Sequence, residues 1–513
     1  MSHLPILPIL VPLCAAILML LMHGLGIRGQ RVIGAASVGA LAAIGMLLLT
    51  TAADGNLRVY RLGDWPAPFG IVLVHDRLAA VMVALTALLA SASLIAATSG
   101  VDAEGRHFHP LLQLQLAGLN GAFLTGDLFN LFVFFEILLL ASYALLTHGP
   151  GAARARAGLG YVIVNLMGSA LFLIALGLVY ATLGTLTMAD LVRVLPSIAE
   201  QDQALVRTAL ALLVAVFLLK AALFPIGFWL PHVYPVTSTP VAMLFVIMTK
   251  VGIYALLRLS TIGLSAAPFT SNLLTPWLAW LAIATISVGL LGMLATRSLA
   301  VVVANLVVVS SGTLLLGVAD GGERAVTAAL FYLMQTTIVA AGLVLLADCI
   351  ARRRGALGDR IEKGPRIADH ASLGAAYLVL AVAAAGIPPL SGFLAKLMLM
   401  RSLAGTATHA AAWTALLVAG LVIALVLARA ASAVFWEPGR STDAMPHPLP
   451  ERAVTRAQTP ALLLLILAAL ALVPASRPIS NYARATAAQL MDRAAYFDAV
   501  IGRGARIDME RRP

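Results

Sequence analysis

Charged side chains are scarce in this sequence. Only 11% of its 513 residues are Asp, Glu, Lys or Arg, whereas 61% are hydrophobic. A soluble globular domain carries about 25% charged residues, so the composition excludes that class and indicates an integral membrane protein. Uncharged runs of about 20 residues recur, and each is long enough for a helix to cross the ~30 Å hydrocarbon core of a bilayer. Alternating ten-residue strands are missing, which argues against a β-barrel.

Cysteine is equally rare. Cys14 and Cys349 are the only two, and both lie in or beside apolar runs, so we expect neither a disulfide framework nor a thiolate metal site. The sequence contains no glycine-rich phosphate loop after a strand, no HExxH, no CxxC and no nucleophile elbow. The paired helical histidines that haem needs are also missing. We therefore expect no cofactor, no metal and no enzyme active site.

The apolar runs predict an all-α polytopic membrane protein with about fourteen transmembrane helices. The first run is apolar from the fourth residue and lacks a basic start and a small-residue cleavage site, so we expect a membrane helix and not a removed signal. The fourth run, HPLLQLQLAGLNGAFLTGD, is the weakest. The runs start near residues 4, 33, 78, 110, 128, 158, 205, 239, 273, 299, 325, 371, 411 and 458.

Basic residues outnumber acidic ones by a net charge of +11. In a membrane protein this excess indicates cytoplasmic loops, so we expect no nucleic-acid partner. The loops after odd-numbered helices are rich in basic residues, which predicts that their face is cytoplasmic and that both termini lie outside. These residues are Arg28, Arg31, Arg106, Arg154, Arg156, Arg297, Arg352–Arg354, Arg360, Lys363, Arg366, Arg440, Arg452 and Arg456.

The C-terminal tail has a pattern of its own. Its arginines oppose this orientation, but Asp492, Asp498, Asp508 and Glu510 offset them. Apolar residues recur at helical spacing in the tail, which predicts a short amphipathic helix lying on the membrane or on a neighbour. They are Leu490, Ala494, Phe497 and Ile501.

Two apolar runs are interrupted in a similar way. One is LLKAALFPIGFWLPHVYP (residues 218–235) and the other is AAAGIPPLSGFLAKLMLM (residues 383–400). Proline removes a helical hydrogen bond and glycine lets the chain bend. Two such broken helices at separate positions indicate a transporter built from repeats. A pair of ordinary proline kinks is the alternative.

Lysine is the rarest basic residue. The chain has four, Lys220, Lys250, Lys363 and Lys396, and all but Lys363 lie within apolar runs. Arginine cannot release its proton in a protein, whereas a buried lysine can, because desolvation lowers its pKa. Arginine outside and lysine inside therefore suit proton loading and release. A lysine that extends to the interface is the alternative, open for Lys396 and poor for Lys250.

Glu136 lies near the middle of the apolar stretch FNLFVFFEILLLASYALL. An isolated ion at the bilayer centre costs about 2.5–3.5 kcal/mol, so we expect Glu136 to pair with one of the lysines, which the sequence alone does not identify. Such a pair can act as a proton switch, because separating it lowers the pKa of the lysine. A static ion pair is the alternative. His232 is a candidate relay or a solvated loop residue, and Asp76 is expected to be an N-terminal helix charge.

Four stretches together, FNLFVFFEILLLASY, LKAALFPIGFWLP, MTKVGIYALLRL and GIPPLSGFLAKLML, resemble the antiporter-like subunits of two machines. These are respiratory complex I and the Mrp (Pha, Mnh) multisubunit cation/proton antiporters. The likeness runs from HDRL at residue 75 to the tail AAQLMDRAAYFDAVIG. FNLFVFFE and the tail are most similar to the D subunits of the Mrp antiporters.

This resemblance implies fourteen helices with two inverted five-helix repeats, in residues 106–262 (helices 4–8) and 263–437 (helices 9–13). Residues 1–105 would form helices 1–3, and residues 438–513 helix 14 and the tail. The seventh and twelfth helices would be the broken ones.

The resemblance also implies roles for the buried charges. Glu136 matches the fifth-helix glutamate and Lys220 the seventh-helix lysine that it pairs with. Lys250 matches the eighth-helix lysine and Lys396 the twelfth-helix lysine near the outlet. His232 lies close to a relay histidine of some relatives. Gln335 stands where relatives often carry histidine, so the path to Lys396 must rely more on water, with Ser310, Ser311 and Thr336 as candidate lining residues.

The function that follows is that of one subunit in a multisubunit Na⁺(K⁺)/H⁺ antiporter of a bacterial inner membrane. Its partners would be the other subunits, the lipid bilayer, protons and Na⁺ or K⁺. Protons would pass from Glu136 and Lys220 by way of Lys250 to Lys396, driven by the proton-motive force. The alternatives are a proton-pumping subunit of complex I or of a membrane-bound hydrogenase, and a stand-alone solute transporter.

Overall fold

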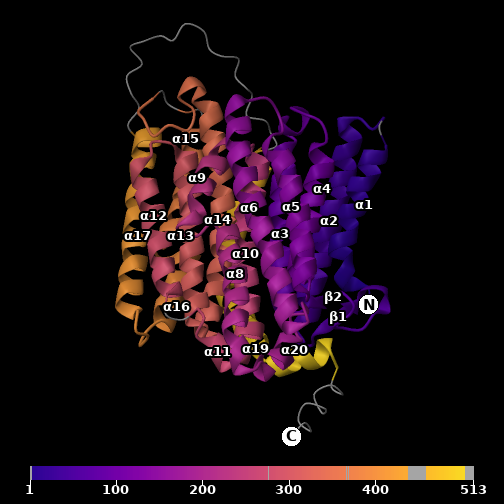
Figure 1. Ribbon diagram of the computed structural model, residues 1–513. Coiled ribbons are helices and arrows are strands. Elements are labelled where there is room, and N and C mark those ends of the chain that lie inside the picture. Colours follow the sequence, from indigo (N-terminus) through magenta and orange to yellow (C-terminus); the bar gives the residue numbers. More distant parts are fainter. Residues whose placement is uncertain are drawn as a thin grey trace.

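The computed structural model describes residues 3–502, except for residue 23 and residues 275–276, 365–366, 368 and 437–457. The chain is mostly helical, and its long helices run side by side between two faces (Figure 1). The helices are α1 (Leu7–Leu21), α2 (Ile27–Ala52), α3 (Arg77–Ala97), α4 (Phe108–Leu124), α5 (Leu128–Leu146), α6 (Ala152–Leu183), α7 (Leu191–Val194), α8 (Gln203–Lys220), α9 (Trp229–Val233), α10 (Thr239–Arg258), α11 (Pro268–Ser271), α12 (Leu278–Ala295), α13 (Leu299–Asp320), α14 (Glu323–Arg353), α15 (His370–Ala385), α16 (Ser391–Ser402), α17 (His409–Ala431), α18 (Gln458–Ala471), α19 (Ser476–Met491) and α20 (Arg493–Val500).

Within the described residues, eleven helices are long and apolar enough to cross a membrane, or twelve if α18 and α19 count as one bent span. The predicted count of about fourteen therefore stays a prediction. The difference arises from short helices. The α4 helix has 17 residues, nearly all buried, and α15 has 16 residues before the chain breaks and continues as α16. A multi-pass membrane protein is the firm conclusion.

The two faces of the bundle differ in their connections. The arginine-bearing loops from α1 to α2, α3 to α4, α5 to α6 and α14 to α15 lie at the top of Figure 1, and the tail helix α20 lies at the bottom. The predicted placement of both termini outside the cell stays a prediction. Four residues used in that prediction, Arg366, Arg440, Arg452 and Arg456, lie outside the described residues, as do Asp508 and Glu510.

Both interrupted runs are broken helices. The α8 helix ends at Lys220, and the chain resumes helical structure only at Ile226–Phe228 and α9. The α15 helix ends at Ala385, and α16 begins at Ser391. In each break, the glycine of the Gly-Phe pair lies against a backbone carbonyl. A β-carbon at Gly227 would overlap the carbonyl oxygen of Ala222, and one at Gly392 that of Ala383.

The prediction of a purely α fold is wrong in one small respect. Strands β1 (Arg58–Arg61) and β2 (Val72–His75) form an antiparallel hairpin between α2 and α3, with Arg58 opposite His75. All four residues of β2 are buried, so the strand packs into the bundle and its pairing with β1 satisfies the backbone.

The tail is helical where predicted, but it consists of two helices. The chain turns by 78° between α18 and α19, and Asp492 then separates α19 from α20, whose first turn it caps by accepting a hydrogen bond from the Ala495 N–H. Leu490 and Phe497 are buried, and α19 packs against α3 and α14. The amphipathic tail therefore lies on the protein itself.

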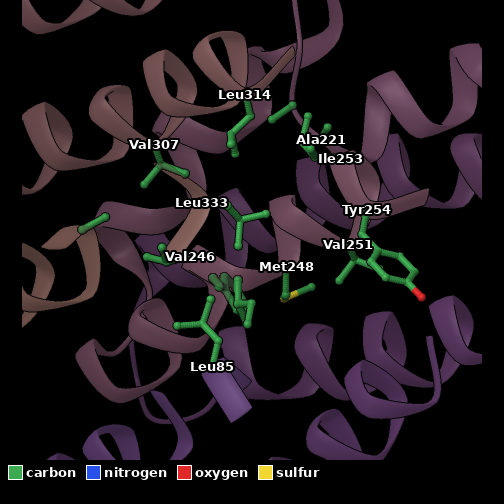
Figure 2. Packing of buried hydrophobic residues seen from close by; sticks show 14 of the residues in the cluster. Leu85, Ala221, Val246, Met248, Val251, Ile253, Tyr254, Val307, Leu314 and Leu333 are labelled. Carbon is green, nitrogen blue, oxygen red and sulfur yellow. The ribbon is translucent and has the colours of Figure 1, made fainter. Parts of the chain in front are cut away.

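The α10 helix occupies the interior. All its residues from Pro240 to Arg258 are buried, and it packs against α3, α8, α13 and α14. Figure 2 shows this core, where Val251 of α10, Leu85, Val307 and Leu333 gather from different helices. Any polar side chain on α10 between Pro240 and Arg258 is therefore enclosed by protein.

Candidate functional site

Three of the four lysines lie inside the bundle. Lys220 ends α8, Lys250 lies in the middle of α10 and Lys396 lies in α16, with exposed fractions of 5%, 0% and 8%. Lys363 is exposed in the loop after α14. The burial of three ammonium groups raises the question of what stabilises each of them.

Glu136 of α5 and Lys220 of α8 meet through a third residue. The Ser169 hydroxyl of α6 donates a hydrogen bond to Glu136 Oε1, and Lys220 Nζ donates to Ser169 Oγ at 3.4 Å. Lys220 Nζ also donates to the backbone oxygen of Asn165 at 3.3 Å and lies 6.0 Å from the centre of the Phe135 ring. In the described part of the chain, no direct ion pair within 4.0 Å joins Glu136 to Lys220. The two charges are therefore linked by a hydroxyl.

Among the described residues, the Lys250 ammonium donates its hydrogen bonds to neutral groups. Its Nζ donates to Ser310 Oγ of α13 at 2.8 Å and to Thr249 Oγ1 at 3.2 Å. Ser310 is one of the residues expected to line the path beyond Lys250. Two hydroxyls satisfy part of the hydrogen-bonding capacity of an ammonium but do not neutralise its charge.

Lys396 lies at the break between α15 and α16. Its Nζ donates to the backbone oxygen of Ala385 at 2.7 Å and to that of Ala384 at 3.5 Å. These carbonyls end α15, and the last carbonyls of a helix carry partial negative charge without intrahelical partners. The broken helix thus supplies the acceptors that Lys396 needs.

Gln335 of α14 also contacts this break. Its Nε2 donates to the backbone oxygen of Ala383 at 3.0 Å, so its side chain faces the end of α15, as Lys396 does. Ser311 follows Ser310 in the sequence and Thr336 follows Gln335, and both are buried. The Ser311 hydroxyl has no hydrogen-bond partner among the described residues. A buried hydroxyl without a protein partner needs an explanation, and an ordered water molecule is one that such groups commonly have.

The structure does not bring His232 to the lysines. The residue is exposed on α9, and its Nδ1 lies 2.8 Å from the Phe228 backbone oxygen one turn earlier. The buried lysines, Glu136 and Gln335 therefore form the internal set, and His232 lies outside it.

Two polar features are absent from the sequence-based interpretation. Ser169 is one, because a serine in an apolar helix gives no signal of its own. The other is Arg258, the last residue of α10, which contacts Asp76 with two nitrogens at 2.5 and 2.7 Å. Asp76 also accepts a hydrogen bond from the Ala79 N–H at 2.8 Å, which agrees with its expected place at the start of α3.

A further buried cluster lies at the arginine-bearing face. Asp102 accepts hydrogen bonds from Arg31 at 2.7 and 2.8 Å and lies 3.0 Å from His109 Nε2. Burial opposes ionisation of Asp102, but the hydrogen bonds from Arg31 and His109 outweigh it and lower its pKa to about 2. Asp102 is therefore ionised at neutral pH and ties α2 and α4 to the loop between α3 and α4.

The internal set can hold and pass protons. One carboxylate and three amines accept and release them, and the hydroxyls of Ser169 and Ser310 can donate or accept hydrogen bonds. Fold and site together define a polytopic membrane protein with protonatable groups in its interior, in the manner of ion transporters.

Comparison with known proteins narrows this class. Residues 125–426, more than half of the chain, match the family described as "NADH:quinone oxidoreductase/Mrp antiporter, TM". The chain is 40% identical over 525 residues to the D subunit of a probable K⁺/H⁺ antiporter of Rhizobium meliloti (strain 1021), covering 96% of each protein. It is 33% identical over 510 residues to the D subunit of an Na⁺/H⁺ antiporter of Alkalihalophilus pseudofirmus, covering 98% of this chain and 100% of that protein.

Solved structures agree. A chain of the Mrp complex from Dietzia sp. DQ12-45-1b superposes with a TM-score of 0.88 at 29% identity, covering 98% of this chain and 100% of that one. A chain of respiratory complex I from Thermus thermophilus gives 0.76 at 25% identity, covering 95% and 99%. The chain belongs to the NADH:quinone oxidoreductase/Mrp antiporter family. Within that family it is similar to the D subunits of cation/proton antiporters.

Proposed function

We propose that this chain is the D subunit of a multisubunit cation/proton antiporter of a bacterial inner membrane, and that protons cross it along its buried lysines. One observation supports this proton path above all. Three buried ammonium groups are held by hydroxyls and backbone carbonyls, and in the described part of the chain none of them pairs directly with a carboxylate. Such partners stabilise a charged lysine only in part, so its proton can leave without breaking a direct ion pair.

The proposed path has three stages. Protons arrive at Glu136 and Lys220, which share the Ser169 hydroxyl. They continue to Lys250, whose neutral surroundings favour brief protonation, and leave from Lys396 at the end of α15. Gln335 cannot hold a proton, so the step from Lys250 to Lys396 runs through water oriented by Gln335 and by hydroxyls such as that of Ser311.

The same proposal includes fourteen membrane helices and two inverted repeats. The parallel between the two breaks supports it, because each has a lysine beside it and a glycine that lies against a backbone carbonyl. Other antiporter subunits would be partners, and Na⁺ or K⁺ the exchanged cation. A role in complex I is the second candidate. The higher TM-score and identity with the Mrp complex favour the antiporter.

The test uses everted vesicles that carry the whole complex and a pH-sensitive dye. Na⁺ and K⁺ are added in turn to wild type, Glu136→Ala, Lys220→Ala, Lys250→Ala and Lys396→Ala. We expect each variant to lower cation-triggered proton exchange by at least about tenfold, because alanine holds no proton and removal of a proton-transfer group typically costs 10²–10⁴-fold.

Lys363→Ala is the matched control, since Lys363 is the one lysine exposed in a loop. It should leave the exchange rate unchanged. Each variant must first be shown to assemble into the complex. Wild-type exchange rates in assembled variants of the buried lysines would show that these charges are structural and would refute the proposed path.

A further inference from the structure

A groove of about 840 Å³ opens on the arginine-bearing face, beside the ends of α1, α4 and α5. Its lining combines apolar side chains with polar and basic ones: Leu20, Leu111, Leu114 and Ala144 on the one hand, and Arg106, His107, Thr147 and His148 on the other. Sites for small molecules have volumes of about 300–1,000 Å³. The groove therefore has the size of a ligand site and a lining that is partly apolar and partly basic.

The unpaired charge in this lining is positive. Glu104 also lines the groove, but it lies 3.4 Å from Arg154, so these two charges offset each other. Arg106 and His107 are exposed, and Arg106 has no ion-pair partner among the described residues. One cationic side chain thus remains at the rim of an apolar groove without a carboxylate of its own.

The groove meets α4 at its N-terminal end. The helix begins at Phe108, and His107, Pro110 and Leu111 line the groove, whereas Phe108 and His109 do not. Pro110 has no N–H, and the Leu111 N–H donates to the His107 backbone oxygen, so the helix start supplies no free N–H of its own to the groove. The positive charge at the groove therefore comes from the side chain of Arg106, with His107 beside it.

The apolar wall continues toward the bilayer. Leu20 and Leu21 end α1 with exposed fractions of 38% and 72%, so the groove opens beside an apolar surface at the end of a predicted membrane helix. A ligand with a negative head and an apolar chain matches both parts. Basic pockets between membrane helices near the membrane surface bind anionic lipid headgroups.

We propose that this groove binds an anionic phospholipid. Its phosphate lies at Arg106 and His107, and one acyl chain runs along Leu20, Leu111 and Leu114. The assignment is independent of the proton path, because none of these residues contacts the buried lysines.

The test places a tryptophan at the groove of the assembled complex with Leu20→Trp, a substitution at a side chain that is already partly exposed. The complex is reconstituted in phosphatidylcholine nanodiscs that contain brominated phosphatidylglycerol or brominated phosphatidylcholine, and the fluorescence of the introduced tryptophan is measured above that of the six native ones. We expect brominated phosphatidylglycerol to quench at about fivefold lower mole fraction, because a basic residue near the surface contributes about 1 kcal/mol to binding an anionic lipid.

Arg106→Gln in the Leu20→Trp background should remove this preference, whereas Arg28→Gln, an exposed arginine on the same face outside the groove, should retain it. Leu166→Trp on the exposed surface of α6 should respond equally to both lipids. If Leu20→Trp does not assemble, Leu114→Trp replaces it. Equal quenching by both lipids at the groove would show unselective bilayer lipid, and quenching by neither would show that another subunit covers the groove. Either result overturns the proposal.

Discussion

Ser169 joins the two buried charges of α5 and α8. A hydroxyl can donate to a carboxylate and accept from an ammonium at the same time, and here it donates to Glu136 and accepts from Lys220. Glu136 and Lys220 are therefore linked through a group that rotates about one bond. A direct ion pair would hold the proton more tightly on the lysine.

We expect Ser169→Ala to slow cation-driven proton exchange about tenfold. A hydrogen bond to a charged group contributes about 1.5–3 kcal/mol, and 1.4 kcal/mol corresponds to a factor of ten. The pH profile of exchange should also shift, because both charges lose a partner. Dye-monitored exchange in everted vesicles between pH 6 and 9 measures both effects.

Ser169→Thr keeps a hydroxyl and should restore most of the rate. Ser287→Ala is the matched control, since Ser287 is exposed and its hydroxyl donates to the backbone oxygen of Ile283 in its own helix. An unchanged rate and pH profile for assembled Ser169→Ala would mean that the bridge takes no part in proton transfer.

The positions of the lysines could be predicted, but their partners could not. A lysine in the middle of an apolar run is a local signal, because few structures tolerate an isolated charge there. Ser310 could only be suspected, and Ser169 could not, because serines in apolar helices more often pack than bind an ion. The carbonyl partners of Lys396 exist only because α15 ends at Ala385, which is a property of the folded break.

The elements that shape the site are the two broken helices. Each break brings a helix end and a glycine into contact, Gly227 with Ala222 and Gly392 with Ala383. The Gly392 contact matters most for the site, since Ala383 O also accepts the hydrogen bond from Gln335. A side chain at Gly392 would therefore displace the α15 end that holds both Gln335 and Lys396.

We expect Gly392→Ala to destabilise the protein by about 1–3 kcal/mol, the usual cost of forcing extra atoms into a packed interior. The melting temperature of the purified complex in detergent, followed by size-exclusion chromatography after heating, measures the effect. Gly177→Ala is the control, because a β-carbon at Gly177 on α6 meets no atom within 4 Å. That change should be neutral or stabilising by about 0.5–1 kcal/mol. Equal melting temperatures for Gly392→Ala and wild type would contradict the close contact.

Helix positions followed well from the apolar runs, because membrane helices must be long and uncharged. The exceptions have local causes. The tail splits at Asp492, whose carboxylate caps α20, so the helical spacing from Leu490 to Ile501 spans two helices. The β1–β2 hairpin was not predicted, since two four-residue strands give a weak pattern beside long helices.

At the scale of the whole molecule, one ion pair joins distant parts of the chain. Asp76 caps the start of α3, and Arg258 ends α10. Arg258 Nε also donates a hydrogen bond to the Tyr254 hydroxyl at 3.0 Å. The Tyr496 ring of the tail helix α20 lies 6.0 Å from the guanidinium carbon. The start of α3, the end of α10 and the tail helix α20 therefore meet at Arg258, and α20 lies at the bottom of Figure 1.

A substitution at Arg258 therefore tests how much the contacts between these three segments contribute to stability. We expect Arg258→Met to destabilise the complex by about 3–5 kcal/mol, because it leaves the Asp76 carboxylate buried without its partner. The double variant Asp76→Asn with Arg258→Met should recover part of this loss, since asparagine keeps the helix cap and carries no charge. Melting temperatures of the three assembled complexes, with limited proteolysis of the tail, measure both effects. If the double variant were no more stable than Arg258→Met, the loss would come from the packing of Arg258 against Tyr254 and Tyr496 and not from the unpaired charge.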